Sequence, residues 1–164
     1  PLNVYGRSKL DGERARAASG CRHFIFRTGW VYAPAGRNFV NAILAAAKTT
    51  TELRVVDDQR GAPTSAAAIA EAVARILADA SLRRKPDGIY HLTAAGETTW
   101  YEFAKEILAL NGLSTPVVPV STAQYPTPAR RPKNSLLDNA KLQATFGVAL
   151  ADWRSGSIIA NLNG

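Results

Sequence analysis

The chain has 164 residues and an apolar fraction of 46%, enough to bury the core of one domain, which argues against intrinsic disorder. Its formal net charge of +7, from 20 basic against 13 acidic residues, suits an anionic ligand. The basic residues are scattered without an interleaved aromatic run, and no apolar stretch approaches the roughly 20 residues of a membrane span, so we expect neither a nucleic-acid partner nor membrane insertion.

The single cysteine indicates the cellular location, and the first residue indicates which part of a protein this chain represents. Cys21 has no partner for an internal disulfide, which fits a reducing, cytoplasmic location. The chain opens on Pro1 and contains no Met, and no strand precedes its first predicted helix. We therefore expect it to be a C-terminal part of a longer protein.

The first predicted helix, residues 5–18, carries Tyr5 and Lys9 four positions apart. This spacing places both side chains on one face, one turn apart. An ammonium group favours the ionised form of a nearby phenol, so such a pair can donate a proton to a carbonyl that is being reduced. Taken alone, the pair fits an ordinary amphipathic helix with an exposed Lys better than a proton donor.

Short apolar runs alternate with helical patterns along the rest of the chain. We expect strands at 23–26, 53–56, 88–92 and 117–120, the last at a sheet edge because Pro119 lacks an amide hydrogen. We expect further helices at 38–48, 65–80, 99–112, 139–146 and 153–162. The apolar stripes of two of them are predicted at Ile69, Val73, Ile76 and Leu77, and at Phe103, Ile107 and Leu110. This alternation indicates an α/β fold with a largely parallel sheet.

Two loops carry residues suited to anions. Residues 57–64 follow a strand and precede a helix, where ligands gather in open α/β sheets; within this loop Arg60 offers a fork for phosphate and Gly61 permits close backbone approach. A Pro-rich loop holds Arg130 and Arg131 as a restricted clamp for a diphosphate. A well-built turn and ordinary surface charges account for these residues equally well.

Other side chains offer less chemistry. Trp30 lies just beyond a strand, where its ring can face a sugar or a nicotinamide, although core packing accounts for it at least as well. Asn38 and Phe39 open a helix whose first amide groups suit an anion. His23 and His91 lie within strands, where we expect packing rather than proton transfer. The sequence has no Cys/His cluster of the zinc-binding kind, and we expect no metal.

Taken together, these motifs resemble the dTDP-4-dehydrorhamnose reductase family of the extended short-chain dehydrogenase/reductase superfamily. The matching stretches span almost the whole chain: residues 5–10, 27–32, 38–40, 55–64 (VVDDQRGAPT), 88–93, 100–104, 129–132, 134–135, 137–139 and 152–154. The resemblance implies the C-terminal portion of a Rossmann-like fold with its substrate-binding subdomain. Residues 1–35 would hold the catalytic helix and following strand of a truncated Rossmann-like domain, and residues 36–164 mostly the substrate-binding subdomain with the remaining Rossmann elements.

The resemblance also implies residue roles. Tyr5 matches the proton donor to the 4-keto group of dTDP-4-dehydro-L-rhamnose, as hydride arrives from NADPH or NADH to yield dTDP-L-rhamnose, and Lys9 matches the residue that assists it and holds the nicotinamide ribose. Cofactor contacts are expected at Tyr5, Lys9, Thr28 and Trp30. Contacts to the nucleotide-sugar substrate are expected at Trp30, Asn38, Phe39, Gln59, Arg60 and Arg130.

Some features of the family are not in this sequence. The glycine-rich dinucleotide turn and the catalytic Ser/Thr lie upstream of the Tyr in the family, so we expect this chain to be inactive by itself. Gly29 stands where a small polar residue is expected. The resemblance allows a homodimer. Two alternatives stay open: another reductase or epimerase of sugar nucleotides, and a non-catalytic reductase-like binding subunit, which would have no need of the Tyr5–Lys9 pair.

Overall fold

Helices and short strands alternate along the chain, as the sequence predicts. The computed structural model describes residues 1–155, apart from the side chain of Arg83. In chain order the elements are α1 (Val4–Ala18), β1 (Phe24–Arg27), β2 (Val31–Tyr32), α2 (Phe39–Ala47), β3 (Leu53–Val56), β4 (Arg60–Gly61), β5 (Thr64–Ser65), α3 (Ala66–Ala78), η1 (Leu82–Arg84), β6 (Gly88–His91), β7 (Thr98–Thr99), α4 (Trp100–Leu110), β8 (Val117–Val120), η2 (Thr122–Gln124), α5 (Ala140–Phe146) and η3 (Trp153–Ser155).

The strands of the described region pair in twos, and parallel pairing predominates. β1 pairs with β6, β2 with β5 and β3 with β8, all parallel, whereas β4 and β7 are antiparallel. Within residues 1–155, β8 has β3 as its one neighbour, with Pro119 opposite Val55. The predicted edge position of Pro119 is therefore confirmed.

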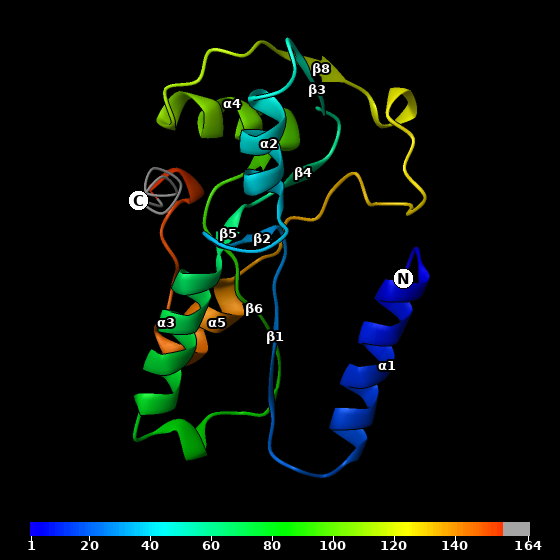
Figure 1. Ribbon diagram of the computed structural model, residues 1–164. Coiled ribbons are helices and arrows are strands. Elements are labelled where there is room, and N and C mark those ends of the chain that lie inside the picture. Colours follow the sequence, from blue (N-terminus) through cyan, green and yellow to red (C-terminus); the bar gives the residue numbers. More distant parts are fainter. Residues whose placement is uncertain (156–164) are drawn as a thin grey trace.

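Two apolar clusters form the cores of the structure (Figure 1). In the lower part of the figure, β1, β6, α3 and α5 pack together, with Tyr90 and Phe146 rings 4.9 Å apart between their centroids. In the upper part, α2, β3, α4 and β8 surround Val40, Phe103 and Ile107. The connections at 27–31, 57–65, 92–99 and 121–139 each pass from one cluster to the other. Loop residues far apart in the sequence therefore meet at this boundary.

Polar side chains cap several of the helices. Oxygen atoms of the Asn3, Asn38 and Thr99 side chains accept hydrogen bonds from backbone amides three positions later, at 2.8, 3.1 and 3.2 Å respectively. Each bond satisfies one of the amides that a helix start leaves without a partner. Gly147 ends α5 at φ 65°, a left-handed conformation that glycine adopts without the steric cost of a side chain.

Parts of the predicted pattern are wrong. Leu77 is 66% exposed and Leu110 is 41% exposed, so neither belongs to the buried stripe of its helix, where Ala72 and Leu108 are buried instead. The loop 57–64 contains β4 and begins β5. In place of the start of the helix predicted at 153–162, the structure has a 3-10 turn, η3, and the remainder of the predicted range lies outside the described residues. In residues 1–155, no helix combines the length and apolar character that crossing a membrane requires.

Candidate functional site

Tyr5 and Lys9 share one face of α1, as their spacing predicts. The Lys9 Nζ atom lies 5.3 Å from the centroid of the Tyr5 ring. The Tyr5 side chain is 71% exposed, and no residue of α1 is buried. Figure 1 shows α1 standing beside the rest of the described chain. The phenol of Tyr5, one turn from an ammonium group, is therefore open to a ligand that approaches beside this helix.

Contacts at its start and in its middle hold α1 against distant parts of the described chain. At its start, Asn3 Nδ2 donates a hydrogen bond to the Arg130 carbonyl oxygen at 3.0 Å. In its middle, Glu13 accepts two hydrogen bonds from the Arg27 guanidinium, at 2.8 and 2.6 Å, and these bonds keep the pKa of the Glu13 carboxyl below its usual value. The helix that carries Tyr5 is thus tied to the arginine loop and to the end of β1.

Trp30 stands in a stack of aromatic rings at the boundary of the two cores. Its ring lies 3.5 Å from that of Trp100 at an interplanar angle of 4°, and Phe39 lies 4.5 Å from the Trp100 ring on a tilted plane. The Trp30 backbone is left-handed at φ 51°, a conformation that costs a side-chain-bearing residue roughly 1–2 kcal/mol. Its Nε1 atom donates to Ser135 Oγ at 2.9 Å. The stack and this hydrogen bond offset the strain.

Gly61 lies directly against the Trp30 indole. A Cβ atom added at this position would stand 2.2 Å from Trp30 Cε2, closer than any real contact. The close backbone approach that the sequence predicts at Gly61 therefore occurs, and its partner is an aromatic ring of the same chain.

Arg60 and Gln59 anchor the loop that follows β3. Arg60 forms an ion pair with Glu97, while its guanidinium side chain stays 53% exposed. The buried Gln59 donates to Thr122 Oγ1 at 3.1 Å and accepts from Trp100 Nε1 at 3.3 Å. Because its guanidinium is exposed, Arg60 can exchange Glu97 for a phosphate group. The Gln59 amide connects Trp100 of the aromatic stack to Thr122 in the loop after β8.

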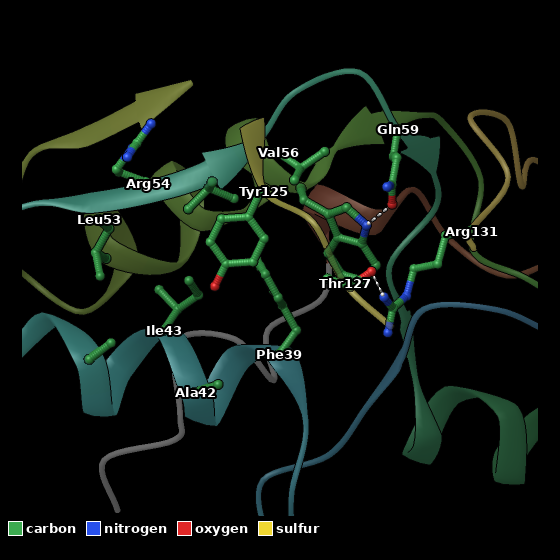
Figure 2. A pocket seen from close by; sticks show the side chains of 13 residues that line it. Phe39, Ala42, Ile43, Leu53, Arg54, Val56, Gln59, Tyr125, Thr127 and Arg131 are labelled. Atoms are coloured by element: carbon green, nitrogen blue, oxygen red, sulfur yellow. Dashed lines mark hydrogen bonds between the residues drawn. The ribbon is translucent and has the colours of Figure 1, made fainter. Parts of the chain in front are cut away.

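Two adjoining cavities open between these elements. The first, about 500 Å³, is mostly apolar and lies between α2, β3 and the start of α4. The second, about 570 Å³, lies along residues 126–133 and reaches Leu2 beside α1. Gln59, Thr127 and Arg131 line both. Figure 2 shows Phe39, Ile43 and Tyr125 turned toward one another in the first cavity, with Gln59 and Arg131 at one end. A single ligand that extends through both cavities would therefore contact aromatic rings in the first and guanidinium groups in the second.

The sequence indicated Arg130 and Arg131 together as a clamp, with a substrate contact expected at Arg130. It did not indicate Trp100 or Tyr125 as lining residues. Arg131 borders both cavities and is held by a hydrogen bond from Nη1 to Thr127 Oγ1 at 2.9 Å, whereas Arg130 lines only the second. Trp100 packs against the upper core and also lines the first cavity, as does Tyr125, which is 51% exposed. Tyr125 lies in a loop without periodicity, so the sequence held no signal for it.

The remaining predicted residues lie in different settings. Phe39 faces the first cavity, but the Asn38 side chain is engaged in capping α2 and in a 2.9 Å bond to the Ala33 carbonyl oxygen. Thr28 is exposed just after β1. His23 and His91 each bond a backbone carbonyl oxygen, of Cys21 and Asp138 respectively. Among the residues described, no three His, Cys, Asp or Glu side chains cluster as metal ligands.

Comparison with known proteins identifies the family. The sequence profile described as "RmlD substrate binding domain" matches residues 1–161. The chain belongs to the RmlD substrate-binding domain family. A curated relative, the dTDP-4-dehydrorhamnose reductase of Escherichia coli K12, is 46% identical over 95% of this chain and 54% of its own length. The resemblance and the α/β, Rossmann-like fold class predicted from the sequence are thus confirmed.

Solved structures agree with this RmlD assignment. A dTDP-4-dehydrorhamnose reductase from Bacillus anthracis in complex with NADP superposes with a TM-score of 0.88 at 34% identity, over 95% of this chain and 54% of that one. A relative from Clostridium acetobutylicum gives 0.86 at 39% identity, over 94% and 53%. The chain spans about half the length of the relatives it matches.

Proposed function

We propose that this chain supplies the sugar-nucleotide site and the proton donor of a dTDP-4-dehydrorhamnose reductase, which reduces the 4-keto group of dTDP-4-dehydro-L-rhamnose to dTDP-L-rhamnose with NADPH or NADH. One observation carries the proposal: the Tyr5–Lys9 pair lies on a helix tied through Asn3 to the loop in which Arg131 lines both cavities. The relative from E. coli carries the name of this activity.

The two cavities suit different parts of the nucleotide sugar: the first suits its base and the second its diphosphate. The rings of Phe39, Trp100 and Tyr125 suit the flat nucleobase, and the mostly apolar first cavity would exclude water from it. Arg131 and the exposed side chain of Arg60 suit the diphosphate, with Arg130 in the second cavity beside them. The faces of the Trp30 ring are covered by Trp100 and Gly61, so an edge of this ring would border the sugar. A nucleotide sugar bound in this order would extend toward Tyr5.

The chain's own residues supply the proton. The Tyr5 hydroxyl donates its proton to the 4-keto oxygen as that oxygen becomes an alcohol, and the Lys9 ammonium stabilises the phenolate that remains. The exposed side chains of Tyr5, Lys9 and Thr28 are accessible to a nicotinamide cofactor, which supplies the hydride when bound. We place the cofactor against these residues and one edge of Trp30.

The two apolar clusters correspond to two parts of the proposed enzyme. The cluster of α2, β3, α4 and β8 forms the substrate-binding subdomain, and that of β1, β6, α3 and α5 completes the Rossmann-like part. A cytoplasmic location fits the exposed, unpaired thiol of Cys21.

A fusion protein tests the reaction. The residues that precede the matched region in the E. coli relative are joined to Pro1, and NADPH oxidation is followed with dTDP-4-dehydro-L-rhamnose. We expect activity in the fusion and none in the 164-residue chain. Tyr5→Phe should lower kcat by about 10²–10⁴, the usual contribution of a positioned acid. Lys9→Met should lower it as well, whereas Lys48→Met, on an exposed helix end, is the matched control.

Two results would contradict the proposal. Full activity in the Tyr5→Phe fusion would remove Tyr5 as proton donor. Faster turnover with a UDP-hexose than with the 4-keto deoxysugar would instead indicate another sugar-nucleotide reductase or epimerase.

A further inference from the structure

Ser135 connects the Trp30 ring to the strand that carries Arg60. Its hydroxyl accepts a hydrogen bond from Trp30 Nε1 at 2.9 Å and donates one to the Arg60 carbonyl oxygen at 2.8 Å. The Ser135 amide donates to the same carbonyl oxygen at 2.9 Å. One small side chain therefore fixes the indole of Trp30 relative to β4, although the two residues are 105 positions apart in the sequence.

Gly61 and Trp100 limit the indole from other directions. Trp100 stacks on the ring face at 3.5 Å, and a Cβ atom at position 61 would overlap the ring. The Trp30 backbone, at φ 51°, also lies in a region that residues with side chains avoid. A ring held by a stack on one face, a glycine against the other face and a hydrogen bond from its Nε1 has one orientation.

Ser135 also belongs to the loop of the arginines. Arg60 N donates to the Lys133 carbonyl oxygen at 2.8 Å, so the segment after Arg131 is docked on β4 immediately before it reaches Ser135. The position of the arginine loop and the orientation of Trp30 consequently depend on the same few bonds.

We propose that Ser135 and Gly61 are positioning residues that hold Trp30 in the orientation in which its ring contacts the sugar of the bound nucleotide sugar. This inference rests on the proposed function, because the contact between Trp30 and the sugar belongs to it. Neither residue touches the substrate; both act through the indole.

A spectroscopic test uses the 164-residue chain itself. Two indoles stacked in parallel couple electronically, and the coupling appears as a couplet in circular dichroism. Trp30→Phe should abolish the couplet, and Trp153→Phe, which changes a tryptophan outside the stack, should leave it. We expect Ser135→Ala and Gly61→Ala to lose most of the couplet and Ser135→Thr, which keeps the hydroxyl, to retain it.

A kinetic test uses the fusion protein described above. A residue that positions a ring against the sugar affects substrate binding more than chemistry, so Ser135→Ala should raise KM for the nucleotide sugar about tenfold and change kcat by less than about twofold. Ser135→Thr should restore KM. If Gly61→Ala does not fold, the two Ser135 variants decide the matter.

The outcomes separate this inference from the proposed function. An unchanged couplet in Ser135→Ala and Gly61→Ala overturns the positioning role. A lost couplet with unchanged KM overturns its link to the substrate. A fusion with no activity on the 4-keto sugar would refute the proposed function, and the couplet would still decide whether Ser135 and Gly61 orient Trp30.

Discussion

Arg131 should contribute more to nucleotide affinity than any other arginine of its loop. It lines both cavities, and its bond to Thr127 holds the guanidinium in place before a ligand arrives. A hydrogen bond to a charged group contributes about 1.5–3 kcal/mol. Replacing Arg131 with Met should therefore weaken binding of dTDP by roughly 10- to 150-fold, since each 1.4 kcal/mol is about a factor of ten.

Titration calorimetry of dTDP and of thymidine into the 164-residue chain measures this effect. Thymidine lacks the diphosphate, so its affinity should be nearly the same for Arg131→Met and the unmodified chain. Arg14→Met, on the exposed face of α1, removes the same charge away from both cavities and is the control. Equal dTDP affinity in Arg131→Met and Arg14→Met would refute the reasoning, as would an equal loss for thymidine and dTDP.

Two further variants test packing and acid sensitivity. Ile76→Ala should destabilise the chain by about 2–5 kcal/mol, and Leu77→Ala by less than about 0.5 kcal/mol, in denaturant unfolding, because Ile76 is 2% exposed and its neighbour 66%; equal losses would disprove the assigned buried face. Hydrogen bonds from Thr122 hold the pKa of Asp58 below its ordinary value, so its stabilisation of the loop after β8 is complete above about pH 4 and is lost as the pH falls through the folded-state pKa. Asp58→Asn should remove this acid-dependent step from an unfolding titration, and a step of unchanged size would rule Asp58 out as its source.

Local signals explain what the sequence could predict. The caps Asn38 and Thr99 and the stop at Gly147 act within a few residues, so the corresponding helix ends agree with expectation. The shared face of Tyr5 and Lys9 follows from helical spacing alone, which needs no tertiary information.

Features that depend on distant partners could not be predicted. β2, β4, β5 and β7 have two residues each, too few to show any periodicity. Leu110 has the apolar spacing expected of the buried stripe of α4. Its burial depends on whether another segment covers the end of this helix, and Leu110 is 41% exposed. Arg130 and Arg131 are adjacent and chemically identical, so only the path of the loop decides which one borders the apolar cavity.

The boundary between the two cores explains why the site residues come from so many segments. The connections that carry Trp30, Arg60 and Arg130 each cross from one apolar cluster to the other, so helix packing alone does not determine their conformation. Bonds between the connections themselves take over: Trp30 to Ser135, Ser135 to Arg60, and Gln59 to Thr122. A loop held mainly by other loops can shift without unfolding either core. The nucleotide sugar, by bridging Trp30 and the arginines, would then add the contacts that hold the connections in one arrangement.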